Sequence, residues 1–196
     1  MTDGRPNSFC DRMRIIAGTY GGRRLKTLKG EALRPTSDQL RETLFSVLGA
    51  SIRSATFLDM YAGSGAVGIE ALSRGAREVV FVEHHRPAVD LIRENLRSLS
   101  IDSGFRIIPS RVQTGLERLA GQGEKFDFVF LDPPYAEIRE YHHTLRELGR
   151  LKILRHTSLV IAEHSRHCQL EERYGVLSRA RLLRHGDSQL AFYQAL

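Results

Sequence analysis

The stretch Leu58-Asp-Met-Tyr-Ala-Gly-Ser-Gly-Ala-Val-Gly68 decides the fold class of this 196-residue chain. Three of its glycines, Gly63, Gly65 and Gly68, form a G-x-G-x-x-G pattern directly after a short apolar segment at 56–60. Glycines at this spacing let a ligand approach the backbone closely, and the N-terminus of the following helix faces that ligand. The stretch therefore predicts a strand, a ligand-binding turn and a helix.

Strands and helices alternate on the C-terminal side of this turn. We expect strands at 56–60, 78–82, 105–108, 126–131 and 158–163, and helices at 66–74, 86–99, 112–120 and 138–148. Repeated strand–helix units predict an α/β fold with a doubly wound, mostly parallel sheet and right-handed crossovers. Two further segments, 175–183 and 189–194, predict an antiparallel C-terminal hairpin.

The N-terminal quarter carries most of the positive charge. The chain has 29 Lys and Arg against 23 Asp and Glu, hence a net charge of +6. Residues 1–53 hold ten basic and five acidic side chains, whereas residues 54–196 hold nineteen and eighteen. A basic stripe on a nearly neutral body is typical of a polyanion-binding surface. The candidate RNA contacts are Arg14, Arg23, Arg24, Arg34 and Thr36.

Composition excludes several classes of protein. Hydrophobic residues make up 41% and charged residues 27% of the chain, which is ordinary globular usage. No apolar run approaches the ~20 residues of a membrane span, and the polar N-terminus lacks the apolar core of a signal peptide. Only two cysteines, Cys10 and Cys168, are present, so a disulfide scaffold is excluded. We expect a cytoplasmic protein that does not associate with membranes and is a monomer.

Two acidic residues favour a cationic nucleoside as the ligand. Asp59 precedes the first glycine by four residues; its carboxylate would repel a pyrophosphate but suits the ammonium group of S-adenosylmethionine. The alternative for Asp59 is a carboxylate that caps a turn or a helix. Glu83 ends the second strand, where it can accept hydrogen bonds from both ribose hydroxyls of a nucleoside, in NAD as well as in S-adenosylmethionine.

The segment Asp132-Pro-Pro-Tyr135 follows an apolar run that has the composition of a central parallel strand. An exocyclic amino group of a base is a poor nucleophile because its lone pair is delocalised into the ring. Two acceptors aimed at its hydrogens orient the lone pair toward a methyl donor, and such positioning supplies much of the rate. Asp132 and the Pro133 carbonyl can be these acceptors, and Tyr135 can stack on an extruded base. The motif predicts methyl transfer to a nucleobase.

This motif resembles that of the amino-methyltransferases of nucleic acids. Further segments resemble the bacterial 16S rRNA (guanine-N2)-methyltransferase family in order and spacing: Arg14-Ile-Ile-Ala-Gly18 with Gly22-Arg-Arg-Leu25, Leu33-Arg-Pro-Thr36, Arg41-Glu-Thr-Leu-Phe45 and 59–76. The resemblance covers Met13 to the C-terminus. It implies a Rossmann-like class I methyltransferase fold, S-adenosylmethionine as cofactor, and a guanine of small-subunit rRNA, naked or in an assembly intermediate, as acceptor.

From this resemblance we expect three parts: a flexible extension at 1–12, a basic hairpin and helix that contact RNA at 13–53, and the methyltransferase domain at 54–196. The family usually has an aspartate after the third strand, near the adenine. Here Ile107-Ile-Pro-Ser-Arg111 contains no acid, so Ser110 or the backbone would contact the adenine. The expected cofactor-binding residues are Asp59, Tyr61, Ala62, Gly63, Ser64, Gly65, Gly68, Glu83, Ser110 and Asp132.

Other functions remain open. A DNA adenine-N6 or cytosine-N4 methyltransferase would share the motif, but such enzymes usually carry a separate target-recognition domain, for which this chain has little room. An NAD(P)-dependent oxidoreductase would leave the segment 132–135 without a role. A non-catalytic RNA-binding module would not need the segment 132–135 either. Direct methyl transfer requires no metal, and we predict none. Glu163-His164 is interpreted as an ordinary solvated or hydrogen-bonded pair.

Overall fold

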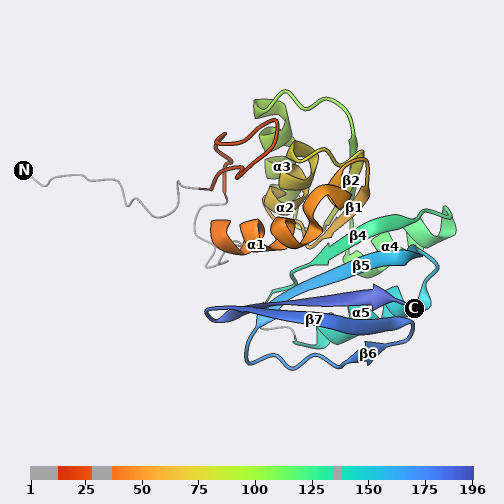
Figure 1. Ribbon diagram of the computed structural model, residues 1–196. Coiled ribbons are helices and arrows are strands. Elements are labelled where there is room, and N and C mark those ends of the chain that lie inside the picture. The colour runs from red at the N-terminus through yellow and green to blue at the C-terminus, as the bar shows by residue number, and fades with distance from the viewer. Residues whose placement is uncertain (1–12, 28–36, 135–137) are drawn as a thin grey trace, which may run out of the picture.

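The computed structural model describes residues 13–27, 37–134 and 138–196 (Figure 1). Their strands form one eight-stranded sheet in the order β3-β2-β1-β4-β5-β8-β7-β6. The strands are β1 (Thr56–Met60), β2 (Glu78–Glu83), β3 (Phe105–Pro109), β4 (Phe126–Leu131), β5 (Leu154–Ser165), β6 (Arg173–Tyr174), β7 (Leu177–His185) and β8 (Ser188–Ala195). Strands β1 to β5 are parallel, and β8, β7 and β6 continue the sheet in antiparallel pairs.

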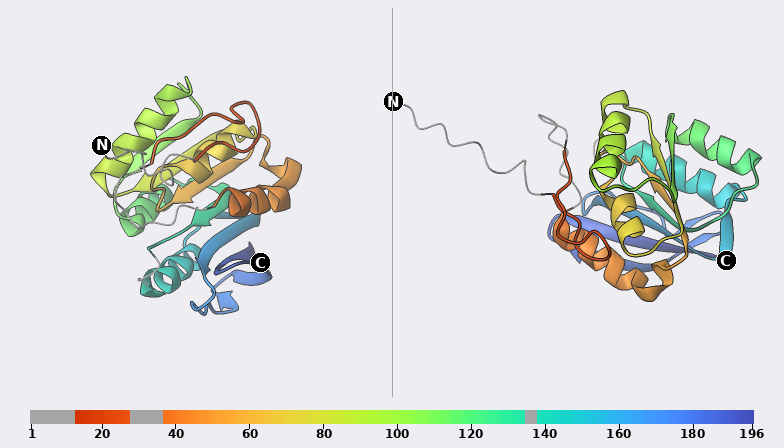
Figure 2. Two further views of the ribbon diagram at one scale, coloured as in Figure 1. Left: turned by 90° about the vertical axis from the view of Figure 1, so that its left-hand side faces the viewer. Right: turned by 90° about the horizontal axis from the view of Figure 1, so that it is seen from above.

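The five α-helices of the described ranges cover both faces of the sheet (Figure 2). The helices α1 (Asp38–Leu48), α2 (Ala66–Ser73) and α3 (Arg86–Ser98) pack on one face, in an apolar cluster with Phe57, Phe81 and Phe130. On the other face, α4 (Val112–Gly121) and α5 (Ile138–Arg150) form a second cluster with Leu58 and Val129. Strands β1, β2 and β4 are buried along most of their length on both faces and are mainly apolar, as central parallel strands are, whereas the edge strand β3 is partly exposed. The expected doubly wound α/β sheet is confirmed.

Most element boundaries agree with the sequence prediction, and the differences have local causes. Helix α1 ends at Leu48 with Gly49, which has a positive φ of 54°, as its C-cap, and a 3₁₀ turn (Gly49–Ile52) follows. Strand β5 extends from 154 to 165 instead of 158 to 163, since its outer residues pair with β4 and β8. The two-residue strand β6 was not predicted. Among the described helices, none is long and apolar enough to cross a bilayer.

The N-terminal segment 13–27 packs against the body of the protein. Its two arms meet in a single antiparallel bridge between Arg14 and Arg24 and are joined by a glycine-containing turn. Met13, Ile15 and Leu25 are buried in the same apolar cluster as α1 and α2. The segments 1–12 and 28–36 lie outside the described residues, so the predicted extension and the position of Arg34 and Thr36 are not addressed by the structure.

Candidate active site

The glycine turn between β1 and α2 lies at the point where the strand order reverses, between β1 and β4. Ligands of open α/β sheets bind at such a point, beyond the carboxyl ends of the strands. Gly63 and Gly65 have positive φ values of 54° and 78°, which favour glycine. A Cβ at Gly68 would lie 2.3 Å from the Phe81 ring, so this glycine allows α2 to pack on β2. Nothing lies closer than 4.0 Å to a Cβ at Gly63, which leaves space for a ligand.

Asp59 reaches this turn from within β1. Its side chain is 2% exposed, and Oδ2 accepts a hydrogen bond of 2.8 Å from the Gly68 N–H. This is one of the free N–H groups in the first turn of α2, so Asp59 caps the helix from the neighbouring strand. Burial raises the pKa of Asp59 to about 8, the Gly68 hydrogen bond opposes this, and the charge of Glu83 adds to it. One carboxylate oxygen of Asp59 therefore caps α2, as in the alternative given for this residue. Contact of Asp59 with an ammonium group stays a prediction.

Glu83 ends β2 and fixes the other side of the turn. Its side chain is buried; Oε2 accepts from the Gly63 N–H at 2.9 Å, and Oε1 accepts from the His85 N–H at 2.8 Å. Each oxygen keeps a further lone pair for a hydroxyl donor. Ser110 follows β3, the next strand of the sheet, and its hydroxyl donates to the Arg111 carbonyl at 3.2 Å. The structure therefore places Glu83 and Ser110 at neighbouring strand ends.

The remaining residues of the predicted turn contact different parts of the fold. Tyr61 has a positive φ of 59°, and its hydroxyl bonds to Thr144 (2.8 Å) and Glu140 (3.2 Å) on α5. The Ala62 N–H donates to the Val82 carbonyl at 3.2 Å, which ties the turn to β2. The turn is therefore held to β2 through its backbone and to α5 through the Tyr61 hydroxyl.

Asp132 and Pro133 directly follow β4, beside the end of β1. Asp132 is partly buried; burial first, and then the charges of Glu163 and Asp59, raise the pKa of its carboxyl well above the ordinary value. Pro133 is buried, and its carbonyl accepts a hydrogen bond of 3.1 Å from the Tyr141 hydroxyl. One lone pair of this proposed acceptor is therefore already used, which the sequence did not reveal. Tyr135 lies outside the described residues.

Two residues near the site were not among the predicted ones. Glu163 lies near the end of β5, where the preceding residue Ala162 pairs with Leu131, so Glu163 lies beside Asp132. Glu163 and His164 are 1% and 2% exposed, which excludes the solvated alternative and leaves the hydrogen-bonded one. The position of Glu163 at the end of a predicted strand, like that of Glu83, is the sequence feature that could have identified it as a site residue. Asn95 on α3 is fully buried and is described below.

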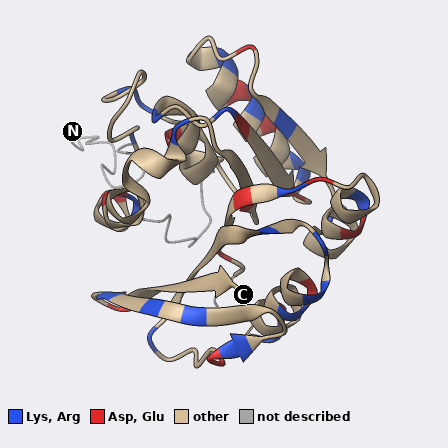
Figure 3. Ribbon diagram, turned by 45° about the vertical axis from the view of Figure 1, so that its right-hand side comes forward, with Lys and Arg blue, Asp and Glu red and all other residues tan. Residues whose placement is uncertain are grey.

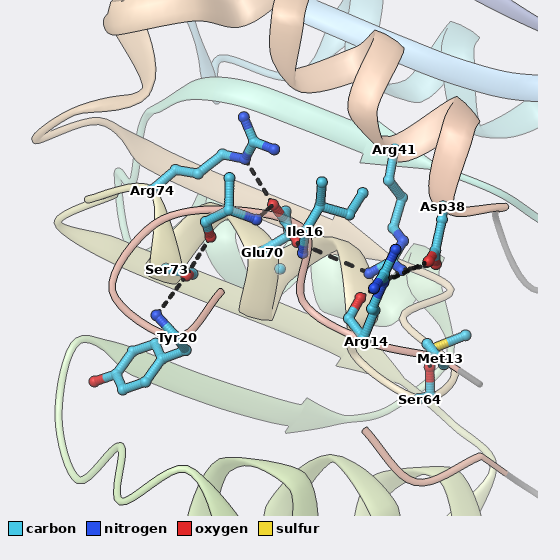
Figure 4. A network of polar contacts seen from close by, with 12 residues as sticks. Met13, Arg14, Ile16, Tyr20, Asp38, Arg41, Ser64, Glu70, Ser73 and Arg74 are labelled. Carbon is cyan, nitrogen blue, oxygen red and sulfur yellow. Dashed lines mark hydrogen bonds and ion pairs between the residues drawn. The ribbon is translucent and has the colours of Figure 1, made fainter. Parts of the chain in front are cut away.

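Residues 13–27 are attached to α2 and the glycine turn by polar contacts (Figure 4), and further polar contacts attach them to α3. Glu70 on α2 accepts hydrogen bonds from the Ile16 and Ala17 N–H groups at 2.7 and 3.1 Å. Asn95 accepts from the Lys26 N–H at 2.8 Å and donates to the Ser64 carbonyl at 3.0 Å. The Ser64 hydroxyl lies 3.5 Å from the Met13 sulfur, in the geometry of a donor to it. The basic segment is therefore anchored beside the turn rather than separate from it.

The candidate RNA contacts of this segment are exposed at its surface. Arg14 pairs with Asp38 at 3.4 Å, and Arg23 donates to the Ser98 carbonyl at 2.8 Å. The side chain of Arg24 forms no ion pair with a described residue, and its backbone bridges that of Arg14. Like charges placed directly across such a pair repel each other, and a polyanion would relieve this repulsion.

The carboxylates around the turn fit a cationic nucleoside. Three carboxylates, Asp59, Glu83 and Asp132, lie at or next to the ends of neighbouring strands around a glycine turn. Burial raises the pKa of Asp59 and Asp132, and the charges of nearby carboxylates raise it further. A cation among them is stabilised, whereas a pyrophosphate would add negative charge. This fold and this site define an S-adenosylmethionine-dependent methyltransferase of the Rossmann-like class.

The chain belongs to the family described as "Conserved hypothetical protein 95", whose model matches residues 13–194. It is 33% identical over 182 residues to "Putative rRNA methyltransferase YlbH" of Bacillus subtilis, covering 93% of this chain and 98% of that one. It is 39% identical over 132 residues to "Ribosomal RNA small subunit methyltransferase D" of Escherichia coli, covering 67% and 65%.

Solved structures agree with this assignment. The fold is similar to that of "Putative methyltransferase yhhF" from Escherichia coli, with a TM-score of 0.81 and 29% identity over 93% of this chain and 97% of that one. It is equally similar to the Thermus thermophilus protein TTHA0928, with a TM-score of 0.81 and 31% identity over 94% and 100%. The expected family resemblance, fold and cofactor are confirmed.

Proposed function

We propose that this protein methylates the exocyclic N2 of a guanine in small-subunit (16S) rRNA. Relatives named as rRNA methyltransferases support the coarser activity, rRNA methylation. The observation that carries the proposal is the position of Asp132 and Pro133 at the end of β4, directly beside the glycine turn of β1. We propose that the protein acts in the cytoplasm as a monomer, on rRNA that is naked or part of an assembly intermediate.

Asp132 is the residue that acts on the amino group. Its partly buried carboxylate accepts a hydrogen bond from the exocyclic N–H and so directs the nitrogen lone pair away from the ring. Asp59, Glu83 and the turn would hold S-adenosylmethionine, which would supply an electrophilic methyl group; as the N–CH3 bond forms, the S–CH3 bond would break and its electron pair would stay on the sulfur of the leaving thioether. The nitrogen carries one proton too many after methylation, and the raised pKa of Asp132 favours its transfer to this carboxylate. The Pro133 carbonyl offers its second lone pair to the other N–H of the amino group. From the sequence, we propose that Tyr135 stacks on the base.

The test measures the modified nucleoside directly. Mass spectrometry of rRNA nucleosides from a strain that lacks the gene should show loss of N2-methylguanosine, restored by the wild-type gene. We expect Asp132→Ala to lower turnover about 10²-fold or more while the affinity for S-adenosylmethionine changes little, because a contact made in the transition state is removed. Asp127→Asn is the matched control, since Asp127 lies at the opposite end of the same strand.

Each alternative predicts a different outcome. Loss of N6-methyladenine or N4-methylcytosine from DNA would identify a DNA methyltransferase. Calorimetric binding of NADH without binding of S-adenosylmethionine would identify an oxidoreductase. An Asp132→Ala variant that retains more than about half of the wild-type rate would contradict the role of Asp132.

A further inference from the structure

The C-terminal hairpin carries a local excess of positive charge. Residues 173–196 contain four arginines and a single acidic residue, Asp187, hence a local net charge of +3. The near-neutral balance of residues 54–196 conceals this excess, because residues 54–172 hold fifteen basic and seventeen acidic residues. Figure 3 shows basic positions following one another along β7 toward the β7–β8 turn.

On β7, the side chains of Arg181 and Arg184 have no partner in the described part of the chain. Both are exposed, and neither side chain forms a hydrogen bond or an ion pair with a described residue. Arg179 on the same strand is different: it donates to the Leu170 carbonyl at 3.1 Å and to Glu172 at 3.3 Å. Arg181 and Arg184 are therefore free to bind an external anion.

The outer edge of β7 is open beside these residues. Strand β6 pairs with β7 only at Leu177 and Ser178, and one further hydrogen bond joins the Arg179 N–H to the Glu172 carbonyl at 2.8 Å. No described strand pairs with this edge from Ala180 to His185. Outward-facing backbone N–H groups there can donate to phosphate oxygens alongside the arginines.

The tip of this hairpin lies at the same sheet edge as the candidate active site. Arg184 pairs with Gln189, which pairs with His164, the neighbour of Glu163. With strands about 4.8 Å apart, the backbone of β7 is about 14 Å from that of β4. His185 next to the turn also contacts Gln39 at the start of α1, at 3.0 Å.

The basic segment 13–27 lies on the opposite flank of this edge. It packs on α2 and α3, beside β1 and β2, whereas β7 lies beyond β5 and β8 (Figures 1 and 2). Positive side chains are thus present on both sides of the end of β4. A polyanion that crosses the site can contact both flanks at once.

We propose that Arg181 and Arg184, whose side chains lie on opposite faces of the open edge strand β7, hold backbone phosphates of the substrate along this edge, on the flank opposite residues 13–27, and so form a second RNA-contacting surface. The inference rests on the proposed function, because the substrate strand is the one presented to Asp132. Phosphate contacts of this kind position the RNA across the site without reading its sequence.

Arginines on an open edge strand also have a second explanation. Charged side chains on an unpaired edge prevent it from pairing with another molecule, independent of any ligand. On this explanation their removal promotes self-association but leaves RNA binding unchanged. The two explanations therefore predict different measurements.

The experiment compares two double variants that lose the same charge. Arg181→Ala with Arg184→Ala removes the proposed contacts. Arg53→Ala with Arg77→Ala is the control, because these arginines are also exposed and without an ion pair to a described residue but lie at the amino ends of β1 and β2. The affinity for a labelled 16S rRNA fragment that the wild type methylates is measured by anisotropy at several salt concentrations.

We expect the first variant to lower the slope of log affinity against log salt by about 1.4 to 1.8, at about 0.7 to 0.9 for each phosphate contact. Relative to 1 M salt, this corresponds to about 25- to 60-fold weaker binding at 0.1 M salt. Restoring the charge with Arg181→Lys and Arg184→Lys should restore most of the slope. The control should keep the wild-type slope, and both variants should keep the affinity for S-adenosylmethionine.

An unchanged slope in the first variant, or an equal decrease in the control, would overturn the inference. Unchanged RNA binding together with self-association on sedimentation would favour edge protection instead. A thermal melt of each variant shows whether it remains folded. If the wild type neither binds nor methylates the RNA, the proposed function fails; if it does both and only the slope is unaffected, the second surface alone fails.

Discussion

Replacement of Asp59 by asparagine removes a buried ionisable group and keeps an oxygen that can accept the Gly68 N–H. Burial raises the pKa of this carboxyl from 3.8 to about 8 in the folded protein. The folded chain therefore binds a proton more tightly than the unfolded chain does. The resulting contribution to stability is fully present below pH 3.8 and is lost as the pH rises through about 8.

The size of the effect follows from proton linkage. Between the two pKa values, the folded state holds about one proton more than the unfolded state, so the free energy of unfolding falls by about 1.4 kcal/mol for each pH unit. From pH 5.0 to pH 7.5 the wild type loses about 3 kcal/mol through Asp59 alone. Asp59→Asn does not ionise and avoids this loss. The variant should therefore gain about 3 kcal/mol relative to the wild type over this interval.

Urea denaturation of both proteins at pH 5.0 and pH 7.5 measures this difference, with the slope against urea checked for constancy. Asp127→Asn is the control. Burial tends to raise the pKa of Asp127, but hydrogen bonds from Thr56 and the charge and hydrogen bond of Arg155 outweigh it, so the pKa is lowered. The effect of this control should not change between the two pH values, because Asp127 is ionised at both. A stability difference for Asp59→Asn that is equal at pH 5.0 and pH 7.5 would refute the reasoning.

Two further predictions concern the ligands. Glu83→Ala should weaken binding of S-adenosylmethionine by about 1.5–3 kcal/mol, because hydrogen bonds to a charged acceptor are lost; calorimetric titration measures it, and an unchanged dissociation constant would place the ribose elsewhere. Arg23→Ala combined with Arg24→Ala should reduce the salt slope of RNA binding by about one to two while leaving the affinity for S-adenosylmethionine unchanged. A constant slope with a lowered melting temperature would instead make this segment purely structural.

The sequence by itself determined the class of the protein, because the relevant features are local. Glycines such as Gly63 and Gly65 tolerate the positive φ that the turn adopts, and the apolar runs around Asp59, Glu83 and Asp132 predict strands that end at or next to these residues. In a parallel sheet the carboxyl ends of strands share one edge, so strand ends alone indicated which side chains meet. The boundaries of β1 and β4 were predicted to the residue.

Only the tertiary structure decided the electrostatics and the contacts of the site. Ionisation depends on burial and on charges that are distant in the chain, and Glu163 raises the pKa of Asp132 although 31 positions separate them. The Pro133 carbonyl is occupied because α5 brings the Tyr141 hydroxyl against it. The anchoring of residues 13–27 by Glu70 and Asn95 is equally invisible in sequence spacing, because backbone groups find their partners only when the chain has folded.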